Sequence, residues 1–466
     1  MNNRKFEANT WFKNFFLLVL SFALIILIGE WLFPKYLNKV PFRLYGGVES
    51  NLRILAQYSK RSVLPENYIA ILGDSNSVGV GDLYIDLSKN YGGWYPDYAP
   101  AHFLHKKLGR DIVSFGFAGA GTLDGIRSGA VQFEYINSKG FDLKPPKTIL
   151  ILFYEGNDLG NNLQFIREHY EGSESFKKLL RSVKFKKWLD LQSQGSIEEN
   201  GVGFWESFIF TRFLIQSVKN LYTEKSKKGK VLAVPTLEEK LFSHVVINGK
   251  AYPLIDSPGS TIFPKNSISH LVKHGKALPM SFTSRIKIGG KSITQAVVNG
   301  EIVPLPGNLQ TPPIILGLKI ADLKNGLFED KLRVGYFIFE EALKRMKKQF
   351  PDSEVKIIYL PSVSSSYKLI SPLTSVISDL GIPSVVGTQV IFQRHLEVCS
   401  EIFKISQRLE VGFFDSTKHM LDASSKGYIH GPKDWTHLNE SGYRALSDSI
   451  SQFILHPSEP YQNCTY

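Results

Sequence analysis

One serine of this chain stands where a hydroxyl could act as a nucleophile. Residues 68–79 read YIAILGDSNSVG: an apolar run rich in β-forming residues ends at Gly73-Asp74-Ser75, and small residues follow. Such a run is typical of a buried parallel strand, and open α/β folds bind ligands beyond the carboxyl ends of their strands. Because a serine hydroxyl is a weak nucleophile, Ser75 could react only with the help of a base and of donors for developing negative charge.

A candidate base lies near the C-terminus, where residues 433–443 read KDWTHLNESGY. Asp434 and His437 are three residues apart, so a single turn can bring the carboxylate beside the imidazole. The aspartate could then accept a hydrogen bond from Nδ1 and leave Nε2 facing the serine. The segment also has a purely structural use, because Asn439 or Ser441 could cap a helix that begins here.

Donors for an oxyanion are expected in two loops. Residues 116–122 (GFAGAGT) directly follow a second apolar run, and their glycines would let a backbone N–H, such as that of Gly119, face the site. A nucleotide-binding loop is the alternative, but the spacing is not G-x-G-x-x-G. After a third run, Asn157 could direct its amide into the same crevice, although Gly-Asn-Asp is also ordinary turn chemistry.

Other polar residues are expected to support the site rather than to react. Asp74 could cap a helix or brace the serine turn, and Asp158 could brace its own loop. Among the remaining histidines, only His430 is a plausible substitute base. We expect structural or surface positions for His395 and His419. No cluster of His, Cys and carboxylate residues has the spacing of metal ligands, so we expect no metal and no organic cofactor.

These residues need a scaffold, and strand and helix patterns alternate along the chain as in an α/β fold. Alternation of this kind indicates a parallel sheet that is covered by helices on both faces. Buried strands are expected at residues 69–72, 111–115, 148–154, 355–360 and 411–414. Helical spacing of apolar residues is present at Phe339, Leu343, Met346 and Phe350 and again at Leu446, Ile450 and Phe453.

The alternation breaks between residues 166 and 332, which predicts an insertion into the α/β core. Its first part is expected to be helical and is basic, because residues 177–187 carry lysines and arginines and no acid. Its second part holds two similar patterns, at 245–254 and 296–305, each with Asn-Gly between β-forming residues. Asn-Gly in this setting is the strongest short signal for a hairpin. The insertion could form a lid or a substrate platform, or it could be a structural elaboration without contact to substrate.

Taken together, the candidate residues resemble the SGNH, or GDSL-type, hydrolase superfamily. The matching blocks are Gly73-Asp74-Ser75, Gly119 within GFAGAGT, Gly156-Asn157-Asp158 and Asp434-x-x-His437. The resemblance covers residues 66–165 and 333–455 and does not reach the insertion or the N-terminal segment. One departure is Asn76, where the family often has an apolar residue, and this leaves the packing around the serine open.

The resemblance implies a flavodoxin-like, three-layer α/β/α core. It implies Ser75 as the nucleophile, His437 as the base and Asp434 as the residue that orients the histidine. It also implies an oxyanion hole that consists of the Ser75 N–H, the Gly119 N–H and the Asn157 amide.

The N-terminus is expected to anchor the chain in a membrane. Residues 15–29 (FFLLVLSFALIILIG) carry no charge, and apolar neighbours extend the run to about 20 residues, enough to cross a bilayer. Arg4, Lys5 and Lys13 precede it and favour a cytoplasmic N-terminus, so that the rest of the chain would be extracytoplasmic. A cleaved signal peptide is the alternative, but no A-x-A-like site follows the run.

This organisation divides the chain into consecutive segments. We expect a cytoplasmic N-terminus and transmembrane anchor over 1–35, a tether over 36–65, the first part of the core over 66–165, the insertion over 166–332, and the second part of the core with the tail over 333–466.

Composition limits the classes of partner. With 466 residues, the chain is long enough for two or three domains, and its 43% hydrophobic and 21% charged residues are ordinary for a folded protein. A net charge of +12 would attract anionic lipid or acidic polysaccharide, whereas no signature of nucleic-acid binding accompanies it. The two cysteines, Cys399 and Cys464, could form one disulfide in an oxidising compartment or remain free thiols.

The function expected from the resemblance is that of a serine acyl-ester hydrolase or acyltransferase that works through an acyl-serine. Membrane-tethered relatives with similar blocks act on O-acetyl groups of extracellular or cell-wall polysaccharide, so acylated carbohydrate is the expected substrate. A lipase or lysophospholipase is one alternative, and it would have an apolar acyl tunnel beside Ser75. A non-catalytic, membrane-tethered protein for glycan binding or assembly is another, and in it His437 would not reach Ser75.

Overall fold

The fold is described from a computed structural model of the chain. The structure describes residues 3–40, 50–81, 99–172, 175–194, 208–215, 217–218, 244–247, 250–253, 287–288, 291–292, 295–298, 301–304, 327–367, 373–377, 383–426, 429–430, 437–456 and 464.

A parallel sheet of five strands forms the centre of the molecule, and all five strands that the apolar runs predict are present. Across the sheet the order is β13-β10-β3-β1-β2, and every neighbouring pair is parallel. β1 therefore lies between the second and third strands of the chain, which makes the gap between β1 and β3 the point where the winding reverses. The strands are β1 (Ile69–Leu72), β2 (Ile112–Ser114), β3 (Thr148–Tyr154), β10 (Glu354–Leu360) and β13 (Gly412–Asp415).

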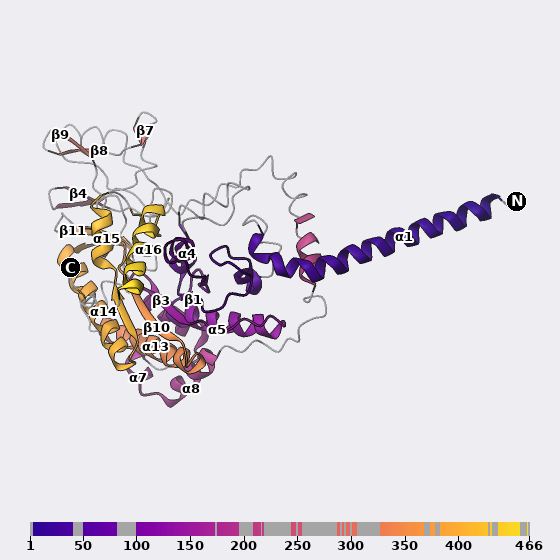
Figure 1. The fold of residues 1–466 in the computed structure, drawn as a ribbon. Coiled ribbons are helices and arrows are strands. Elements are labelled where there is room, and N and C mark those ends of the chain that lie inside the picture. Colours follow the sequence, from indigo (N-terminus) through magenta and orange to yellow (C-terminus); the bar gives the residue numbers. More distant parts are fainter. Residues whose placement is uncertain are drawn as a thin grey trace.

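Helices cover both faces of this sheet, as Figure 1 shows. Successive residues of each strand point to opposite faces, so Ile69 and Ile71 enter one apolar cluster while Ala70 and Leu72 enter the other. One cluster is closed by α4 (Pro100–Leu108), α15 (Thr417–Ser424) and α16 (Glu440–Leu455). The other is closed by α5 (Thr122–Ser138), α6 (Asp158–His169), α13 (Leu327–Gln349) and α14 (Thr388–Arg408).

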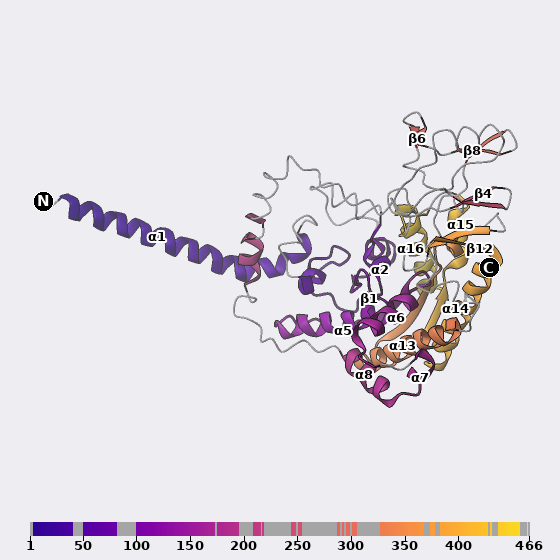
Figure 2. The same ribbon diagram turned by 180° about the vertical axis from the view of Figure 1, so that it is seen from behind.

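The N-terminal helix α1 (Asn3–Leu32) projects from the body (Figures 1 and 2). It is long and apolar enough to cross a membrane, and its apolar side chains between Trp11 and Trp31 are largely exposed. A side chain such as Leu27, 64% exposed, costs free energy in water and would be stable in a bilayer.

The segment expected to be a tether packs against the body of the protein. Two 3-10 helices, η1 (Phe33–Lys39) and η3 (Ser50–Ala56), contact each other, and Leu37 and Leu55 are completely buried in the larger apolar cluster. Lys60 is also buried, and its Nζ donates to the carbonyl oxygens of Leu55 and Val63. The described apolar residues between α1 and β1, such as Leu37 and Leu55, are therefore part of the core.

Within residues 166–332, the basic part is helical: it forms α7 (Phe176–Leu179) and α8 (Val183–Gln194), which pack on α13, and a helix follows at residues 209–215 and 217–218. Both predicted hairpins are present, with β4 (His244–Ile247) paired to β5 (Lys250–Pro253) and β8 (Gln295–Val298) paired to β9 (Glu301–Pro304). Two further hairpins, one in the insertion and one after β10, were not expected from the sequence. They are β6 (Lys287–Ile288) with β7 (Lys291–Ser292), and β11 (Leu373–Ile377) with β12 (Pro383–Gly387).

Cys399 and Cys464 are joined in a disulfide, the alternative that the sequence left open. Cys399 lies on α14 and is completely buried, so the bond fastens the C-terminal tail to the helix layer on one face of the sheet. Asp415 at the end of β13 is close to both sulfurs, but sulfurs that are bonded to each other do not serve as metal ligands.

Candidate active site

The turn that carries Ser75 depends on a glycine with a positive φ and on a carboxylate that caps a short helix. β1 leads into Gly73, whose φ of +141° favours glycine. If another residue stood here, its Cβ would lie only 2.7 Å from the Leu152 carbonyl oxygen. Asp74 then caps the short helix α2 (Ser75–Val78) by accepting a hydrogen bond from the Asn76 N–H at 2.9 Å. Ser75 is thus the first residue of a helix at the carboxyl end of β1.

His437 contacts the serine directly. Its Nε2 lies 2.8 Å from Ser75 Oγ, although the two residues are 362 positions apart. Ser75 is buried and His437 is half-buried, so the pair lies at the edge of the protein surface rather than in the core. A neutral imidazole with its proton on Nδ1 would accept a hydrogen bond from the serine hydroxyl in this geometry.

Two contacts explain how the C-terminal segment comes so close to the serine turn. A Cβ at Gly81, where φ is +146°, would overlap the Leu438 carbonyl oxygen and lie 3.3 Å from His437 Cβ, so only glycine lets the two segments approach. Tyr443, buried in α16, donates its hydroxyl to the Val80 carbonyl oxygen at 2.5 Å. The N-terminus of α16 is therefore locked onto the segment that follows α2.

The remaining residues of the C-terminal block take different positions. Asp434 lies outside the described residues. Asn439 caps α16, accepting from the Gly442 N–H at 3.0 Å, which is one of the two caps expected there. His430 is buried, and its Nδ1 lies 3.1 Å from the Tyr367 hydroxyl, whereas it is His437 that contacts Ser75.

The glycine loop after β2 lies against the serine turn. The Phe117 N–H donates to the Gly73 carbonyl oxygen at 3.0 Å, and a Cβ at Gly125 on α5 would touch the Gly73 backbone at about 3 Å. Gly119 has a φ of +82°, and the space beside its Cα is open. The loop therefore presents backbone, without a side chain in the way, next to the turn that carries the serine.

Asn157 begins α6 at the end of β3 and connects the third loop to the same turn. Its side chain hydrogen-bonds the Asp74 carboxylate. Its Oδ1 is buried and has no hydrogen-bond partner among the described residues. An amide placed in this way, beside β1 and directly after β3, lies at the gap where the winding of the sheet reverses.

Two buried carboxyl groups, those of Asp74 and Asp158, lie at this edge. Burial raises the pKa of Asp74, although the Asn76 N–H, the charge of His437 and the Asn157 amide oppose that rise. Burial, together with the charge of Asp74, raises the pKa of Asp158 well above its ordinary value. Asp158 Oδ2 accepts from the Tyr154 N–H at 2.8 Å, so this side chain braces its own loop, as the sequence indicated.

Sequence reasoning missed the two residues that hold the glycine loop. Asn161 Nδ2 donates to the carbonyl oxygens of Ala120 at 3.0 Å and Gly119 at 3.4 Å. Asn162 Oδ1 accepts from the Leu123 N–H at 3.1 Å. Both are on α6, one turn after Asn157, and the only signal in the sequence is that helical spacing.

A second polar cluster lies at the carboxyl ends of β3, β10 and β13, and it is entirely buried. Glu155 Oε2 lies 2.9 Å from His395 Nδ1 and accepts from the Ser362 N–H at 2.9 Å. Burial alone would raise the pKa of Glu155, but attraction to His395 and these hydrogen bonds lower it. Burial alone would lower the pKa of His395, but the charge of Glu155 and its hydrogen bond raise it. The pair ties the end of β3 to α14, and Ser362 adds the end of β10, which agrees with the structural role expected for His395.

His419 lies on α15 and is half-buried, and its Nε2 contacts the side chain of Gln452 at 3.1 Å. A structural or surface position was expected for it.

No model of a known protein family matches this chain, and no curated protein matches it either. What the site can do therefore has to be inferred from its own geometry. A serine hydroxyl within hydrogen-bond reach of an imidazole, beside loops with free backbone and an amide, is an arrangement that can form and stabilise an acyl-serine.

Proposed function

We propose that this chain is a membrane-anchored serine acyl-ester hydrolase or acyltransferase of the SGNH type. The observation that carries the proposal is the 2.8 Å contact between His437 Nε2 and Ser75 Oγ. Nucleophile and base must lie within about 2.6–3.2 Å for the base to take the proton of the attacking hydroxyl. A non-catalytic scaffold has no need of this contact across 362 residues.

Two features of the fold add support. The strand order corresponds to 2-1-3-4-5 along the chain, which is the flavodoxin-like order. Ser75, the loop of Gly119 and Asn157 follow β1, β2 and β3 in turn, as the SGNH pattern requires. The role of Asp434 as the residue that orients His437 is part of the proposal and comes from the sequence resemblance alone.

In the proposed mechanism, His437 removes the proton from Ser75 while Oγ attacks the ester carbonyl carbon. Negative charge builds on the carbonyl oxygen and is stabilised by the N–H groups of Ser75 and Gly119 and by the Asn157 amide. Loss of one such donor costs about 3–4 kcal/mol in the barrier. The protonated histidine then donates its proton to the departing alcohol, which leaves an acyl-serine. Water hydrolyses this intermediate, or a sugar hydroxyl accepts the acyl group.

The proposed substrate is an O-acyl group on extracytoplasmic carbohydrate. α1 can cross a membrane, and the Cys399–Cys464 disulfide fits an oxidising compartment. Basic side chains of α8 and α13, together with Asp190 and Glu341, line a hollow on the surface near the end of α13 that leads into the amino-terminal end of β10. Since Ser75 is at the carboxyl edge of the sheet, an anionic polymer bound there would lie away from the reacting ester. The residues of this hollow include Lys186, Lys344, Arg345 and Lys348.

The test is hydrolysis of a small acetyl ester by the full-length protein in nanodiscs, compared with the variants Ser75→Ala and His437→Gln. We expect each variant to lose activity by a factor on the order of 10³ or more. The double variant should have about the same activity as the less active single variant, because the two residues act as a unit. His419→Gln removes an imidazole on α15 that is half-buried, like that of His437, and is the matched control. Activity of Ser75→Ala equal to that of the unchanged protein would refute the nucleophile.

The same assay separates the lipase alternative. An O-acetyl enzyme should turn over acetyl esters faster than esters of long fatty acids, whereas a lipase should show the opposite preference. Adding acetylated and unacetylated polysaccharide as donor and acceptor then distinguishes hydrolysis from transfer, since transfer leaves the acetyl group on the second sugar.

A further inference from the structure

A helix from the insertion crosses the end of α1. Residues 209–215 and 217–218 are helical, and this helix runs across α1 near Leu32 rather than alongside it (Figures 1 and 2). Glu30 of α1 joins the two: its carboxylate accepts from the backbone N–H groups of Phe210 at 3.0 Å and Thr211 at 2.8 Å, and from the Thr211 hydroxyl at 2.7 Å. A carboxylate at the end of a membrane-spanning segment is costly unless it is paired, and here the first turn of the crossing helix pairs it.

Apolar contacts fix the crossing. A Cβ at Gly29 would overlap the Phe210 ring, so glycine at this position lets the ring pack on the backbone of α1. The ring of Phe33 contacts Phe210 at 5.5 Å and Phe213 at 4.6 Å between centroids. Phe33, Ile209 and Phe213 also pack against the larger apolar cluster of the body. The crossing helix therefore connects α1 to the catalytic domain.

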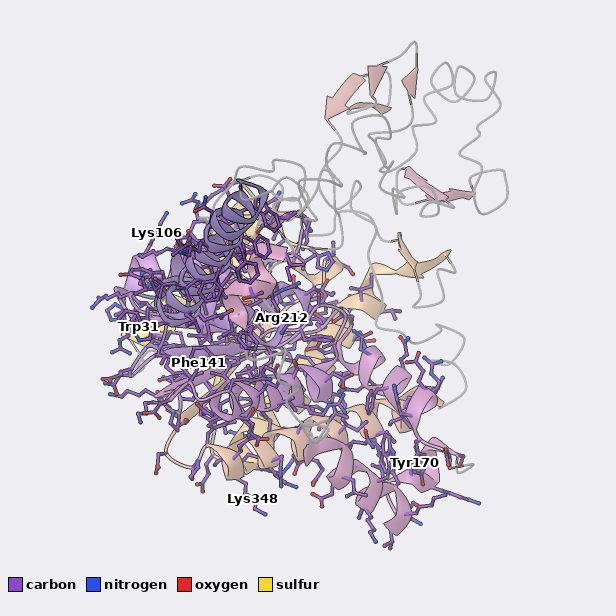
Figure 3. The ribbon with its side chains drawn as sticks, turned by 90° about the vertical axis from the view of Figure 1, so that its right-hand side faces the viewer. Trp31, Lys106, Phe141, Tyr170, Arg212 and Lys348 are labelled. Atoms are coloured by element: carbon purple, nitrogen blue, oxygen red, sulfur yellow. A yellow bond between two sulfur atoms is a disulfide. The ribbon has the colours of Figure 1, made fainter. Side chains whose placement is uncertain are left out.

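The side chains of α1 and η1 near the crossing are of the types found at a membrane–water interface. Trp31 is 66% exposed, and the Lys35 ammonium lies 3.9 Å from the centre of its ring. Tryptophan, tyrosine and lysine with this exposure are typical anchors at the boundary between lipid and water. Figure 3 views the molecule from this side, with Trp31 and Arg212 labelled beside α1.

The crossing helix exposes two large apolar side chains. Ile215 and Val218 are one turn apart and are 40% and 50% exposed. In the sequence, the helix is followed by Lys219, Lys225, Lys227, Lys228 and Lys230 with only one acid among them. An apolar face that continues into a basic segment matches the headgroup layer of an anionic bilayer.

We propose that the helical residues 209–215 and 217–218 lie in the headgroup layer of the bilayer crossed by α1, as an interfacial helix with Ile215 and Val218 facing lipid. The occupant of this face is phospholipid, because the helix is held against the membrane-spanning α1 at Gly29 and Phe33 and a basic segment follows it in the sequence. The helix then holds the catalytic domain in one orientation against the membrane. The inference rests on the proposed membrane anchor and not on the acyl-ester chemistry, so each can fail without the other.

The experiment measures how deeply single side chains lie in the bilayer. Because both native cysteines are in the disulfide, a single added cysteine can be labelled with an environment-sensitive fluorophore in the full-length protein. The variants are Ile215→Cys and Val218→Cys, with Leu27→Cys inside α1 as the positive control. Val183→Cys is the matched negative control, since Val183 is 80% exposed but lies on α8. Each is reconstituted into vesicles of phosphatidylethanolamine and phosphatidylglycerol that carry spin labels at the top or at the end of the acyl chains.

We expect the labels at 215 and 218 to be quenched more strongly by shallow than by deep spin labels, and the label at 183 to be quenched by neither. If the labels at 215 and 218 behave like the label at 183, the proposal is wrong. A label at 215 or 218 that is protected from both the spin-labelled lipid and aqueous iodide would report a protein neighbour instead of lipid, which also overturns the proposal. If the label at 27 is not quenched, α1 is not in the bilayer and the interfacial helix fails with it, whatever the esterase assay shows. Should one of the two variants not fold, the other carries the same test.

Discussion

The hydroxyl of Ser75 has two polar neighbours, and the distances show which of them it hydrogen-bonds. Its Oγ lies 3.4 Å from Asp74 Oδ2 and 2.8 Å from His437 Nε2. A hydroxyl bond to an oxygen or nitrogen is normally shorter than about 3.0–3.2 Å, so the hydroxyl bonds the imidazole and not the carboxylate. The Asp74 carboxylate instead accepts hydrogen bonds from Asn76 and Asn157, so Asp74 is the residue that shapes the turn.

The pH dependence of stability should reveal the electrostatic repulsion between the buried carboxylates of Asp74 and Asp158. Because the folded pKa of Asp158 is raised well above the ordinary value, the folded state binds more protons than the unfolded state between the two values. Stability is therefore lost as the pH rises through that window. Asp158→Asn keeps an oxygen that can accept from the Tyr154 N–H but removes the buried charge. We expect the variant to gain stability relative to the unchanged protein at about pH 7, and to gain less at about pH 4.

Denaturant unfolding at both pH values measures this difference. Asp422→Asn, which removes an exposed carboxylate on α15, is the control and should show no such pH-dependent gain. An equal effect of Asp158→Asn at both pH values would contradict the raised pKa as its cause.

At the scale of elements, the site depends on three loops that follow neighbouring strands, and α6 joins two of them. Asn157 at the start of α6 contacts Asp74 of the serine turn, and Asn161 one turn later holds the carbonyl groups of Gly119 and Ala120. A rigid helix thus sets the distance between the amide and the glycine loop. Oxyanion donors are effective only when they are fixed before the charge develops.

We therefore expect Asn161→Ala to lower kcat of the ester assay while leaving KM nearly unchanged. Removing the hydrogen bonds to the loop should cost roughly 1 kcal/mol, which corresponds to about a fivefold slower reaction. Gln164→Ala on the same helix removes an exposed amide that pairs only with Glu168 in the described structure, and it should leave kcat unchanged. An unchanged kcat in Asn161→Ala, or a loss that falls on KM alone, would remove Asn161 from the positioning of the loop.

At the scale of the whole molecule, contacts between distant segments close the fold. The disulfide joins α14 to the tail over a sequence separation of 65 residues. The Glu155–His395 pair joins the ends of β3 and α14. Residues 33–40 and 50–56 join α1 to the larger apolar cluster. A domain closed in this way holds the serine at a fixed position relative to α1.

Removing the disulfide should lower stability more than activity. A bridge that closes a loop of this length restricts the unfolded chain, and its loss costs roughly 2–4 kcal/mol. We expect the double variant Cys399→Ser/Cys464→Ser to unfold at a lower denaturant concentration and to keep its kcat below that transition. Reductant should destabilise the unchanged protein and have no effect on the variant. Equal stability of the two proteins in the absence of reductant would contradict a structural role for the bond.

Much of the sheet could be predicted from the sequence, because the strands are local apolar runs. The expected run at 148–154 coincides with β3, and the runs at 111–115 and 411–414 differ from β2 and β13 by one residue at each affected end. Both Asn-Gly hairpins were predictable for the same reason, since two residues set the turn and the flanking β-formers set the register. The short apolar stretches of residues 36–65 gave no periodic signal, and only packing shows that Leu37 and Leu55 belong to the core.

The sequence by itself determined which hydroxyl follows the first buried strand and which blocks could serve it, since these depend on neighbours along the chain. The tertiary structure alone decided that His437, and not His430, contacts Ser75, because that contact depends on Gly81 and Tyr443. It also decided that Asn161 holds the glycine loop and that a helix of the insertion meets Glu30. These contacts join segments that are 41 to 363 residues apart, and no local propensity encodes them; they follow from how the layers pack on the sheet.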